Sequence, residues 1–131
     1  MAARSSLPEN PAKRRLLRLK TRAEFLKVQR GARRATPSLT LEACRGPDDS
    51  ALRVGFTASR KIGNAVTRNR AKRRLRAAAA EVLPKEGRAG FDYVLVARAG
   101  TLSEPYGRLV ADLASALALA HVRLEANAGT A

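Results

Sequence analysis

The sequence has few of the residues that catalytic and metal-binding sites need. Its 131 residues include a single cysteine, Cys44, a single histidine, His121, and no tryptophan. One cysteine can form neither an internal disulfide nor a cysteine-rich zinc site, which indicates a reducing compartment. One histidine excludes a Ser-His-Asp or Cys-His arrangement unless His121 serves it, and nothing near His121 suggests so. We therefore expect neither catalytic side chains nor metal ligands in this chain.

Aromatic residues and long apolar runs are also scarce. Aromatic residues make up 4% of the chain, whereas apolar residues make up 45%, most of them Ala, Leu and Val. This apolar share is typical of a globular protein, and the core must be mainly aliphatic. No apolar run approaches the roughly 18–20 residues of a membrane span, so we expect no membrane association. The length suits one domain better than two.

Acidic residues are few, and basic residues are concentrated in one part of the chain. The 11 acidic residues face 26 basic ones, giving a net charge of +15, and residues 1–76 alone carry 21 basic and 5 acidic side chains. Most of the cations are arginines, whose planar guanidinium binds phosphate through two parallel hydrogen bonds and stacks on bases. A GC-rich coding sequence would also favour arginine over lysine, but it does not explain the clustering. The charge therefore favours a polyanionic partner.

Hydrophobic periodicity and capping residues predict an alternation of helices and strands. The predicted elements are a helix at 22–30, strands at 38–43 and 52–59, a helix at 64–82, a strand at 91–98 and a last helix capped by Ser103. Pro84 and Gly87 are expected to end the second helix. We expect an α/β (α+β) fold with a small mixed sheet and packed helices over 16–124. A disordered basic arm at 1–15 and a frayed tail at 125–131 are expected to flank this domain.

Residues 60–76 contain eight cations and no acidic residue. They are Arg60, Lys61, Arg68, Arg70, Lys72, Arg73, Arg74 and Arg76. On a helical wheel Ala71, Leu75, Ala78, Ala79 and Val82 share one face, so most of the cations occupy the opposite side. Solvated helix faces normally interleave Glu with Lys, and like charges four residues apart repel each other. A surface that a polyanion neutralises is therefore favoured over an ordinary solvated face.

Two residues of this helix are special cases. Arg68 falls within the apolar arc of the helix, so its side chain bends back either toward the helix cap or toward a ligand. Asn69 is suited to a ribose hydroxyl or a base edge, but an ordinary polar surface residue is an equally good interpretation.

A second group of ten cations, with one acidic residue, lies within residues 11–41. Its members are Lys13, Arg14, Arg15, Arg18, Lys20, Arg22, Lys27, Arg30, Arg33 and Arg34. Phe25 lies among them on the first helix, either as part of the core or beside the sheet, where its ring could stack on an unpaired base. Arg98, at the end of the third strand, either reaches a phosphate or pairs with Asp92. Tyr106 is expected in the core.

The string FTASRKIGNAVTRNRAKRRLRAA, residues 56–78, resembles the signature of the bacterial ribonuclease P protein component. The family pattern G-N-A-V-x-R-N-R-x-K-R-x-x-R is matched by Gly63, Asn64, Ala65, Val66, Arg68, Asn69, Arg70, Lys72, Arg73 and Arg76. The segments RLKTRAEFLKVQRG (18–31) and DYVLVAR (92–98) are similar to the family's first helix and third strand. Together the resemblance covers most of residues 16–120.

The resemblance implies a function and a fold. The function is that of the accessory protein subunit of a ribonucleoprotein endonuclease, a cytoplasmic hydrolase that removes the 5′ leader of precursor tRNA. The partners implied are the catalytic RNA and precursor tRNA, with no obligate protein partner, and Mg²⁺ is held by the RNA subunit and the substrate. The fold implied is a sandwich like domain 2 of ribosomal protein S5 with a left-handed strand–helix–strand crossover, although right-handed crossovers are the general rule.

The resemblance also assigns residues to two surfaces. The residues implied in docking on the RNA subunit are Asn64, Arg68, Asn69, Arg70, Lys72, Arg73 and Arg76. Those implied in a cleft for the single-stranded leader, between the first helix and the sheet, are Phe25, Thr57, Arg60, Lys61 and Arg98. The sequence departs from the family pattern at Gln29 and Glu42, where many members carry aromatic residues. We therefore expect Arg and Lys to contribute more to this cleft.

Two other hypotheses compete with this one. A structural RNA-binding protein of the ribosome would have a similar charge and fold without a substrate cleft, and only the signature and the Phe25 helix separate the two. A basic helix for an anionic membrane or an acidic protein would need a larger apolar face than the alanine-rich stripe of residues 64–82 provides.

Overall fold

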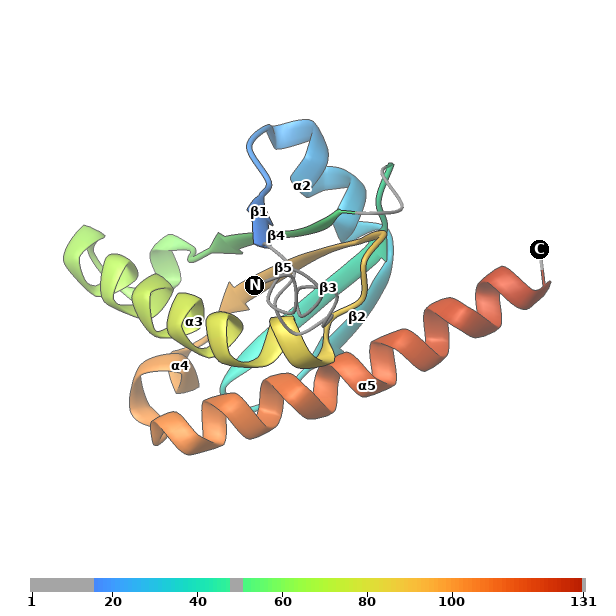
Figure 1. The fold of residues 1–131 in the computed structure, drawn as a ribbon. Helices are drawn as coiled ribbons and strands as arrows, with labels where there is room; N and C mark the ends of the chain where they lie inside the picture. The colour runs from blue at the N-terminus through green and yellow to red at the C-terminus, as the bar shows by residue number, and fades with distance from the viewer. Residues whose placement is uncertain (1–15, 48–50, 131) are drawn as a thin grey trace, which may run out of the picture.

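The computed structural model describes residues 16–47 and 51–130, with the side chains up to residue 125 (Figure 1). The basic arm expected at 1–15 lies outside the described residues. The elements are β1 (Leu16–Arg18), α2 (Arg22–Gln29), β2 (Ala32–Ala35), β3 (Leu39–Arg45), β4 (Leu52–Thr57), a 3-10 helix (Arg60–Ile62), α3 (Ala65–Glu86), β5 (Phe91–Ala97), α4 (Ala99–Ser103) and α5 (Tyr106–Thr130).

The five strands form one mixed sheet in the order β1-β4-β5-β3-β2. The strand β4 runs parallel to β1 and β5, whereas β3 is antiparallel to both β5 and β2. The parallel neighbours β4 and β5 are joined through α3, and this is the crossover for which the resemblance implies a left-handed sense. The expected mixed sheet with packed helices is confirmed.

One face of the sheet carries the main core. Alternate residues of the central strands, among them Leu41, Val54 and Tyr93, are buried beneath α3 and α5, which lie side by side across this face (Figure 1). The helix α3 buries Ala71, Leu75, Ala78, Ala79 and Val82, so the predicted packing face is confirmed. The other face is covered only in part, by α2, and this leaves room for a cleft.

The sole histidine belongs to this core. His121 is 4% exposed, and its Nε2 lies 2.6 Å from the hydroxyl of Tyr93. The backbone N–H of Arg88 donates to that hydroxyl at 3.0 Å, so the Tyr93 proton is free to donate to the neutral imidazole. Burial, with a smaller contribution from Arg88, lowers the pKa of His121 from 6.5 to about 4. The residue is therefore a structural one, held neutral by its surroundings.

We expect this burial to make the protein less stable in mild acid. As the pH falls from 6.5 to about 4, the unfolded chain takes up a proton at His121 that the folded protein does not, so the free energy of unfolding decreases in that window. The loss from this residue should be roughly 3 kcal/mol. Urea unfolding at a series of pH values measures it. His121→Gln, which does not titrate and can still accept from Tyr93, should show a shallower decrease, and equal slopes for the two proteins would contradict the prediction.

The sequence patterns did not predict the two short strands β1 and β2. The strand β1 has three residues, and β2 has the sequence ARRA, so neither shows an apolar alternation. Both form the edges of the sheet and are held by backbone pairing to β4 and β3. Because backbone pairing depends little on side-chain type, no sequence pattern predicts such strands.

Several predicted helix boundaries were wrong. Pro84 lies inside α3, which continues to Glu86; it removes one backbone donor near the helix end, while the fully buried Leu83 keeps this turn on the core. Ser103 ends the short helix α4 rather than capping α5, which begins after Pro105, a residue common at helix starts. Residues 125–130, expected as a frayed tail, continue α5, although Gly129 is a poor helix former.

Tyr106 was also placed wrongly. It is exposed at the start of α5, and its hydroxyl donates to Glu81 Oε2 of α3 at 2.6 Å. Partial burial and the neighbouring Glu81 carboxylate raise the pKa of Tyr106 to about 12. The apolar stripe of α5 therefore begins one turn later, at Leu109.

Candidate RNA-binding surfaces

The start of α3 is defined by Gly63 and Asn64. Gly63 has a φ of +146°, a region that favours glycine, and a Cβ there would lie 2.9 Å from Thr67 Cγ2. Asn64 is the N-cap, since its Oδ1 accepts a hydrogen bond from the Thr67 backbone N–H at 2.9 Å. Asn64 thus has a structural function in addition to the RNA contact that the resemblance implies.

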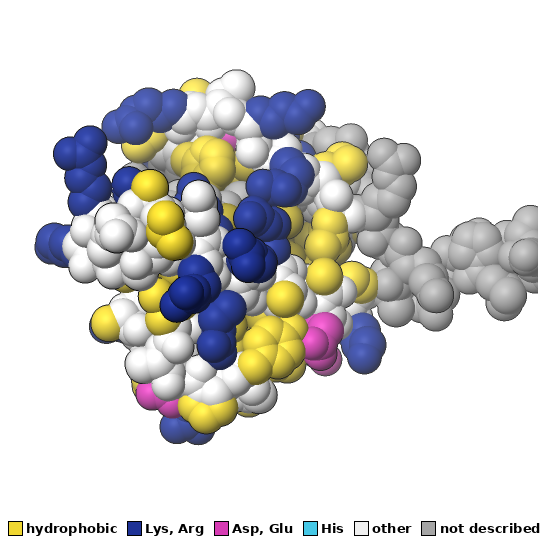
Figure 2. All heavy atoms as spheres, turned by 90° about the vertical axis from the view of Figure 1, so that its left-hand side faces the viewer, with side chains coloured by type: hydrophobic (Ala, Val, Ile, Leu, Met, Phe, Trp, Pro, Cys, Tyr) yellow, Lys and Arg dark blue, Asp and Glu magenta, His cyan; other side chains and the backbone are white. Residues whose placement is uncertain are grey.

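The helix α3 presents a basic face to solvent. Asn69, Arg70, Arg73 and Arg76 are exposed, and Lys72 is half-buried. Figure 2 looks at the side of the molecule where α3 begins and shows Lys and Arg side chains gathered in a band across it. Because Ala71 and Leu75 between these cations are buried in the core, the backbone that carries the charges is held rigidly.

Arg68 and Arg74 lie partly against the protein. Both are half-buried, and in both the Nε atom is buried without a hydrogen-bond partner among the described residues. Arg74 Nη2 donates to the Glu104 carbonyl at 2.7 Å and so ties α3 to the segment before α5. Arg68 makes no such bond among the described residues, and buried donors of this kind are usually satisfied by water or a ligand. The sequence-based expectation that Arg68 bends back is consistent with this half-buried position.

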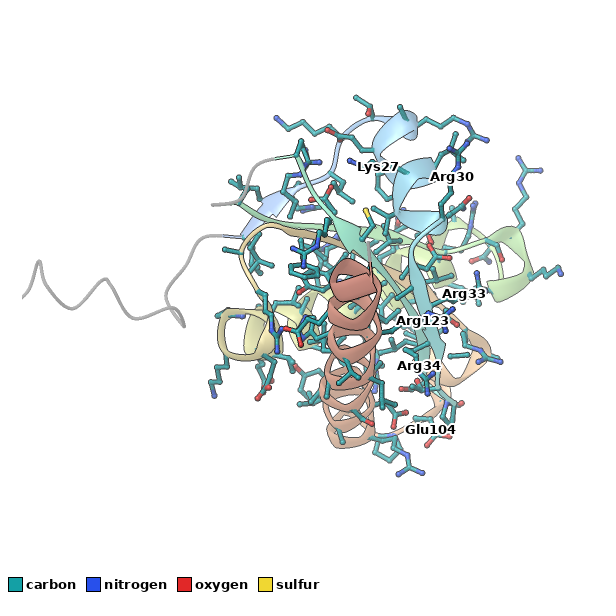
Figure 3. The ribbon with its side chains drawn as sticks, turned by 90° about the vertical axis from the view of Figure 1, so that its right-hand side faces the viewer. Lys27, Arg30, Arg33, Arg34, Glu104 and Arg123 are labelled. Atoms are coloured by element: carbon teal, nitrogen blue, oxygen red, sulfur yellow. The ribbon has the colours of Figure 1, made fainter. Side chains whose placement is uncertain are left out.

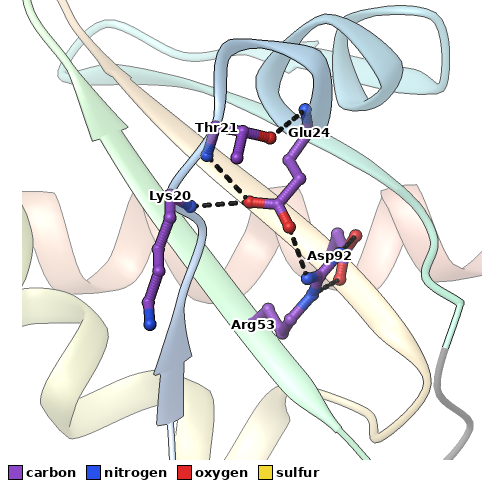
Figure 4. Close-up of polar contacts among 5 residues, drawn as sticks. All are labelled: Lys20, Thr21, Glu24, Arg53 and Asp92. Carbon is purple, nitrogen blue, oxygen red and sulfur yellow. Dashed lines mark hydrogen bonds and ion pairs between the residues drawn. The ribbon is translucent and has the colours of Figure 1, made fainter.

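The helix α2 is attached to the sheet by a hydrogen-bonded network of five residues (Figure 4). Thr21 and Glu24 form a capping box, in which Glu24 Oε1 accepts from the backbone N–H groups of Thr21 and Lys20 at 3.0 and 2.7 Å. Glu24 Oε2 accepts from Arg53 of β4 at 2.9 Å, and Arg53 binds both carboxylate oxygens of Asp92 on β5, at 2.9 and 2.7 Å.

These contacts determine the protonation of the network. The two backbone hydrogen bonds, with a smaller contribution from Arg53, lower the pKa of Glu24 to about 2. The Asp92 hydrogen bonds raise the pKa of Arg53 above its ordinary value. At neutral pH Glu24 and Arg53 are therefore charged, and the hydrogen bonds of the network hold α2 at one position above the sheet.

Phe25 forms part of both a small core and a cleft wall. Its ring lies over β4 at Gly55, where an added Cβ would be 2.5 Å from the ring. It packs against a buried cluster of Leu19, Val28, Cys44 and Val94, yet it remains half-buried and lines the space between α2 and the sheet. Phe25 is therefore both part of a core and beside the open face of the sheet, while the stacking of its ring on a base stays a prediction.

Two adjoining hollows make up the cleft on the open face of the sheet. The first, of about 510 Å³, lies between α2 and the sheet; its lining includes Lys20, Arg22, Phe25, Gln29, Glu42 and Thr57. The second, of about 530 Å³, lies beside the 3-10 helix; its lining includes Ala35, Thr40, Ser59, Lys61 and Arg98. Arg33 and Val96 line both hollows, so the two hollows adjoin at these residues.

The structure brings together four of the five residues predicted for the leader cleft. Phe25 and Thr57 line the first hollow, and Lys61 and Arg98 line the second. Arg60 is exposed on the 3-10 helix and lines neither. The alternative pairing of Arg98 with Asp92 does not occur: Arg98 Nη1 donates to the Thr36 carbonyl at 2.9 Å, while Asp92 is bound by Arg53.

Arg33 is a cleft residue that the sequence analysis did not single out. Its Nη1 donates to Glu42 Oε2 at 2.9 Å; the Arg33 side chain is 62% exposed and that of Glu42 is 4% exposed. Burial raises the pKa of the Glu42 carboxyl, and the Arg33 guanidinium opposes this effect. Gln29 and Glu42, the two positions noted above as departures from the family pattern, both line the first hollow. The only available signal was that Arg33 and Glu42 pair across β2 and β3, which depends on a strand that the sequence does not reveal.

Neither a metal centre nor a membrane span is recognisable in the described part of the chain. Within residues 16–47 and 51–130, no three His, Cys, Asp or Glu side chains are grouped as metal ligands would be. No helix in the same ranges has the length and apolar character to cross a bilayer.

Comparison with known proteins gives one consistent result. The family model described as Ribonuclease P matches residues 14–121. The ribonuclease P protein component of Paramagnetospirillum magneticum is 53% identical over 108 residues, which cover 79% of this chain and 81% of that protein. The corresponding protein of Ruegeria pomeroyi is 49% identical over 106 residues, covering 79% and 85%.

Solved structures show the same fold. The RNase P protein of Staphylococcus aureus superposes with a TM-score of 0.66 at 26% identity, covering 81% of this chain and 96% of that one. For the RNase P protein of Thermotoga maritima the TM-score is 0.62 at 24% identity, covering 76% and 94%. The chain therefore belongs to the ribonuclease P protein family and is the accessory protein subunit of this RNA-containing endoribonuclease.

Proposed function

We propose that the basic face of α3 binds the RNA subunit while the cleft on the open sheet face holds the 5′ leader of precursor tRNA. The observation that carries this proposal is the continuity of the two surfaces. Thr57 at the end of β4 and Lys61 of the 3-10 helix line the cleft, and the chain then passes through Gly63 directly into α3. A leader in the cleft would thus lie next to the RNA bound on α3.

The residues of α3 suit a folded RNA. Arg70, Arg73 and Arg76 offer exposed guanidinium groups for phosphates, and Asn69 offers an amide for a ribose hydroxyl or a base edge. Arg68, half-buried at the same end of α3, brings a further guanidinium group, whose buried Nε has no hydrogen-bond partner among the described residues. Mutual repulsion among these cations decreases when phosphates neutralise them, so binding should weaken steeply with added salt.

The cleft suits a single strand better than a duplex. Phe25 offers an aromatic ring for one base, whereas Arg33, Lys61 and Arg98 place cations along the two hollows. Phe25 and Phe56 are the two aromatic residues among those that line the first hollow, so the contribution of these cations to leader binding is expected to be large.

Catalysis would then remain with the RNA. We propose that Mg²⁺ is held by the RNA subunit and the substrate, and that the protein contributes positive charge where phosphates of the two RNA molecules crowd together. Neutralising these phosphates reduces the concentration of Mg²⁺ needed to assemble the complex. A ribosomal structural role, the competing hypothesis, is not favoured by the relatives at up to 53% identity.

The test is cleavage of a precursor tRNA by the RNA subunit at low Mg²⁺, with and without the protein. We expect the protein to restore cleavage at the mature 5′ end. If the protein bound the RNA but left cleavage unchanged, the proposal would fail and a structural RNA-binding role would replace it.

The leader half of the proposal is tested with Phe25→Leu, which keeps an apolar side chain on the Leu19 cluster but removes the ring. Stacking of one base is worth about 1–3 kcal/mol, so affinity for leader-bearing tRNA should fall by about five- to 150-fold. Affinity for mature tRNA should not change. Equal losses for both RNAs would assign Phe25 to packing alone.

A further inference from the structure

A group of cations lies where the cleft reaches the edge of the sheet. The strand β2 is the last strand on that side, and both α2 and α5 pack against it. A band of four cations runs along this edge, named here the β2 edge, with Arg33 in the middle (Figure 3). The four are Lys27 of α2, Arg30 at the C-cap of α2, Arg34 of β2 and Arg123 of α5. None of these four side chains belongs to the α3 face or lines either hollow.

The β2 edge is open to a ligand. Lys27, Arg30 and Arg123 are exposed and Arg34 is half-buried. Among the described residues none of the four makes an ion pair. The nearby carboxylates do not neutralise them, because Glu42 is bound by Arg33 and Glu125 by Arg88, whereas Glu104 lies at the far end of the band (Figure 3).

The geometry also connects this edge to the cleft. Arg33 lines both hollows and stands on β2 with its side chain largely exposed, held on one side by the buried carboxylate of Glu42. The neighbouring residue on the strand, Arg34, points to the other side of the sheet. A strand that leaves the cleft past Arg33 therefore meets the four cations of the β2 edge, and the described carboxylate beside this path, that of Glu42, is bound by Arg33.

We propose that the β2 edge binds the phosphates of the upstream part of the 5′ leader, the part that extends beyond the cleft. The inference rests on the proposed function, because it takes the cleft as the leader site. A single-stranded RNA fits better than an acidic protein, because three of the four cations are arginines, which bind phosphate through two parallel hydrogen bonds. The cations are also spread along the edge, as the successive phosphates of a strand would be (Figure 3). The contacts are to the backbone, so the edge recognises leader length and not leader sequence.

The test measures binding of precursor tRNAs with successively longer leaders to the complex of the protein with its RNA subunit. The variant is the combination Lys27→Ala, Arg30→Ala and Arg123→Ala, which changes only exposed side chains. The matched control is Lys85→Ala, Arg45→Ala and Arg108→Ala, which removes one exposed lysine and two exposed arginines from other surfaces. Assembly with the RNA subunit is measured for both.

For the unsubstituted protein we expect affinity to rise further once the leader is longer than the cleft. The β2-edge variant should lose this additional gain in affinity, which we expect to be about tenfold or more. The slope of the logarithm of its binding constant against the logarithm of the salt concentration should become shallower, by roughly one for each lost phosphate contact. Its affinity for short leaders should equal that of the control variant, which should keep the whole length dependence.

Other outcomes would overturn the inference. Equal losses for short and long leaders would place the RNA subunit or the tRNA body on the β2 edge, and no loss at all would leave the edge without a role in binding RNA. The proposed function would survive both results. It would fail, and the inference with it, if the unsubstituted protein bound leader-bearing and leaderless tRNA equally well.

Discussion

Replacement of Arg68, Asn69 and Arg70 by alanine is expected to weaken binding of the protein to the RNA subunit by at least a hundredfold. Hydrogen bonds to charged groups contribute about 1.5–3 kcal/mol each, and the substitution removes two guanidinium groups and one amide from the same part of α3. Even if the three contacts are not additive, a loss of about 3 kcal/mol or more remains, which is more than a hundredfold in the dissociation constant. Titration of labelled RNA subunit measures it.

A control variant must show that the weaker binding comes from the lost contacts to RNA, and not from a lower net charge or from loss of the folded structure. The control variant, Lys85→Ala combined with Arg108→Ala, also removes two positive charges, but from exposed positions away from the signature residues at the start of α3. It should weaken binding only slightly. Circular dichroism checks folding, because Arg68 is half-buried, whereas Asn69 and Arg70 are exposed. If the triple variant folded and bound the RNA subunit as tightly as the control variant did, the docking function of α3 would have to be given up.

The second large effect is expected at Arg53. Replacement by methionine should lower the free energy of unfolding by about 3–5 kcal/mol, because Asp92 would stay buried without its partner. Asp92 is 2% exposed and receives two hydrogen bonds from Arg53, at 2.9 and 2.7 Å. Removal of Arg53 also releases Glu24 at the start of α2. Urea denaturation measures the loss.

Two comparisons make this result specific. Arg53→Met combined with Asp92→Leu should recover much of the loss, because replacement of a whole buried ion pair by apolar residues is often nearly neutral. Arg108→Ala, which breaks a 4.0 Å pair between the exposed Arg108 and the half-buried Asp112, should cost no more than about 1 kcal/mol, because Asp112 keeps its hydrogen bond from Ser38. A loss at Arg53 as small as that at Arg108 would show that the network does not hold α2 on the sheet.

The Arg53 network also bears on the cleft, since α2 forms one of its walls. Thr21 and Phe25 line the first hollow, and the capping box that orients them ends in Arg53. Arg53 lines neither hollow. Its effect on leader binding would therefore be indirect, through the position of Phe25 relative to Gly55.

Sequence patterns correctly predicted those features whose interacting residues lie within a single helix. The buried stripe of α3 from Ala71 to Val82 was correctly predicted, because a helix whose apolar residues share a face must bury that face. The capping box at Thr21 was correct for a similar reason: its donors and acceptors lie within four residues of one another. The family signature lies on such an element, and so the family could be inferred from the chain alone.

Contacts between distant segments were decided only by the fold. Arg98 bonds Thr36 and not Asp92, because Asp92 and Arg98 lie at opposite ends of β5, about 20 Å apart along the strand. The register of β4 beside β5 places Arg53 opposite Asp92. The pair of Arg33 with Glu42 depends on β2, a strand whose sequence carries no apolar alternation.

The sequence by itself thus determined the charge, the basic helix with its buried stripe, and the family. The cleft and the β2 edge were decided by the tertiary structure, because backbone pairing and burial place side chains that no spacing along the chain relates.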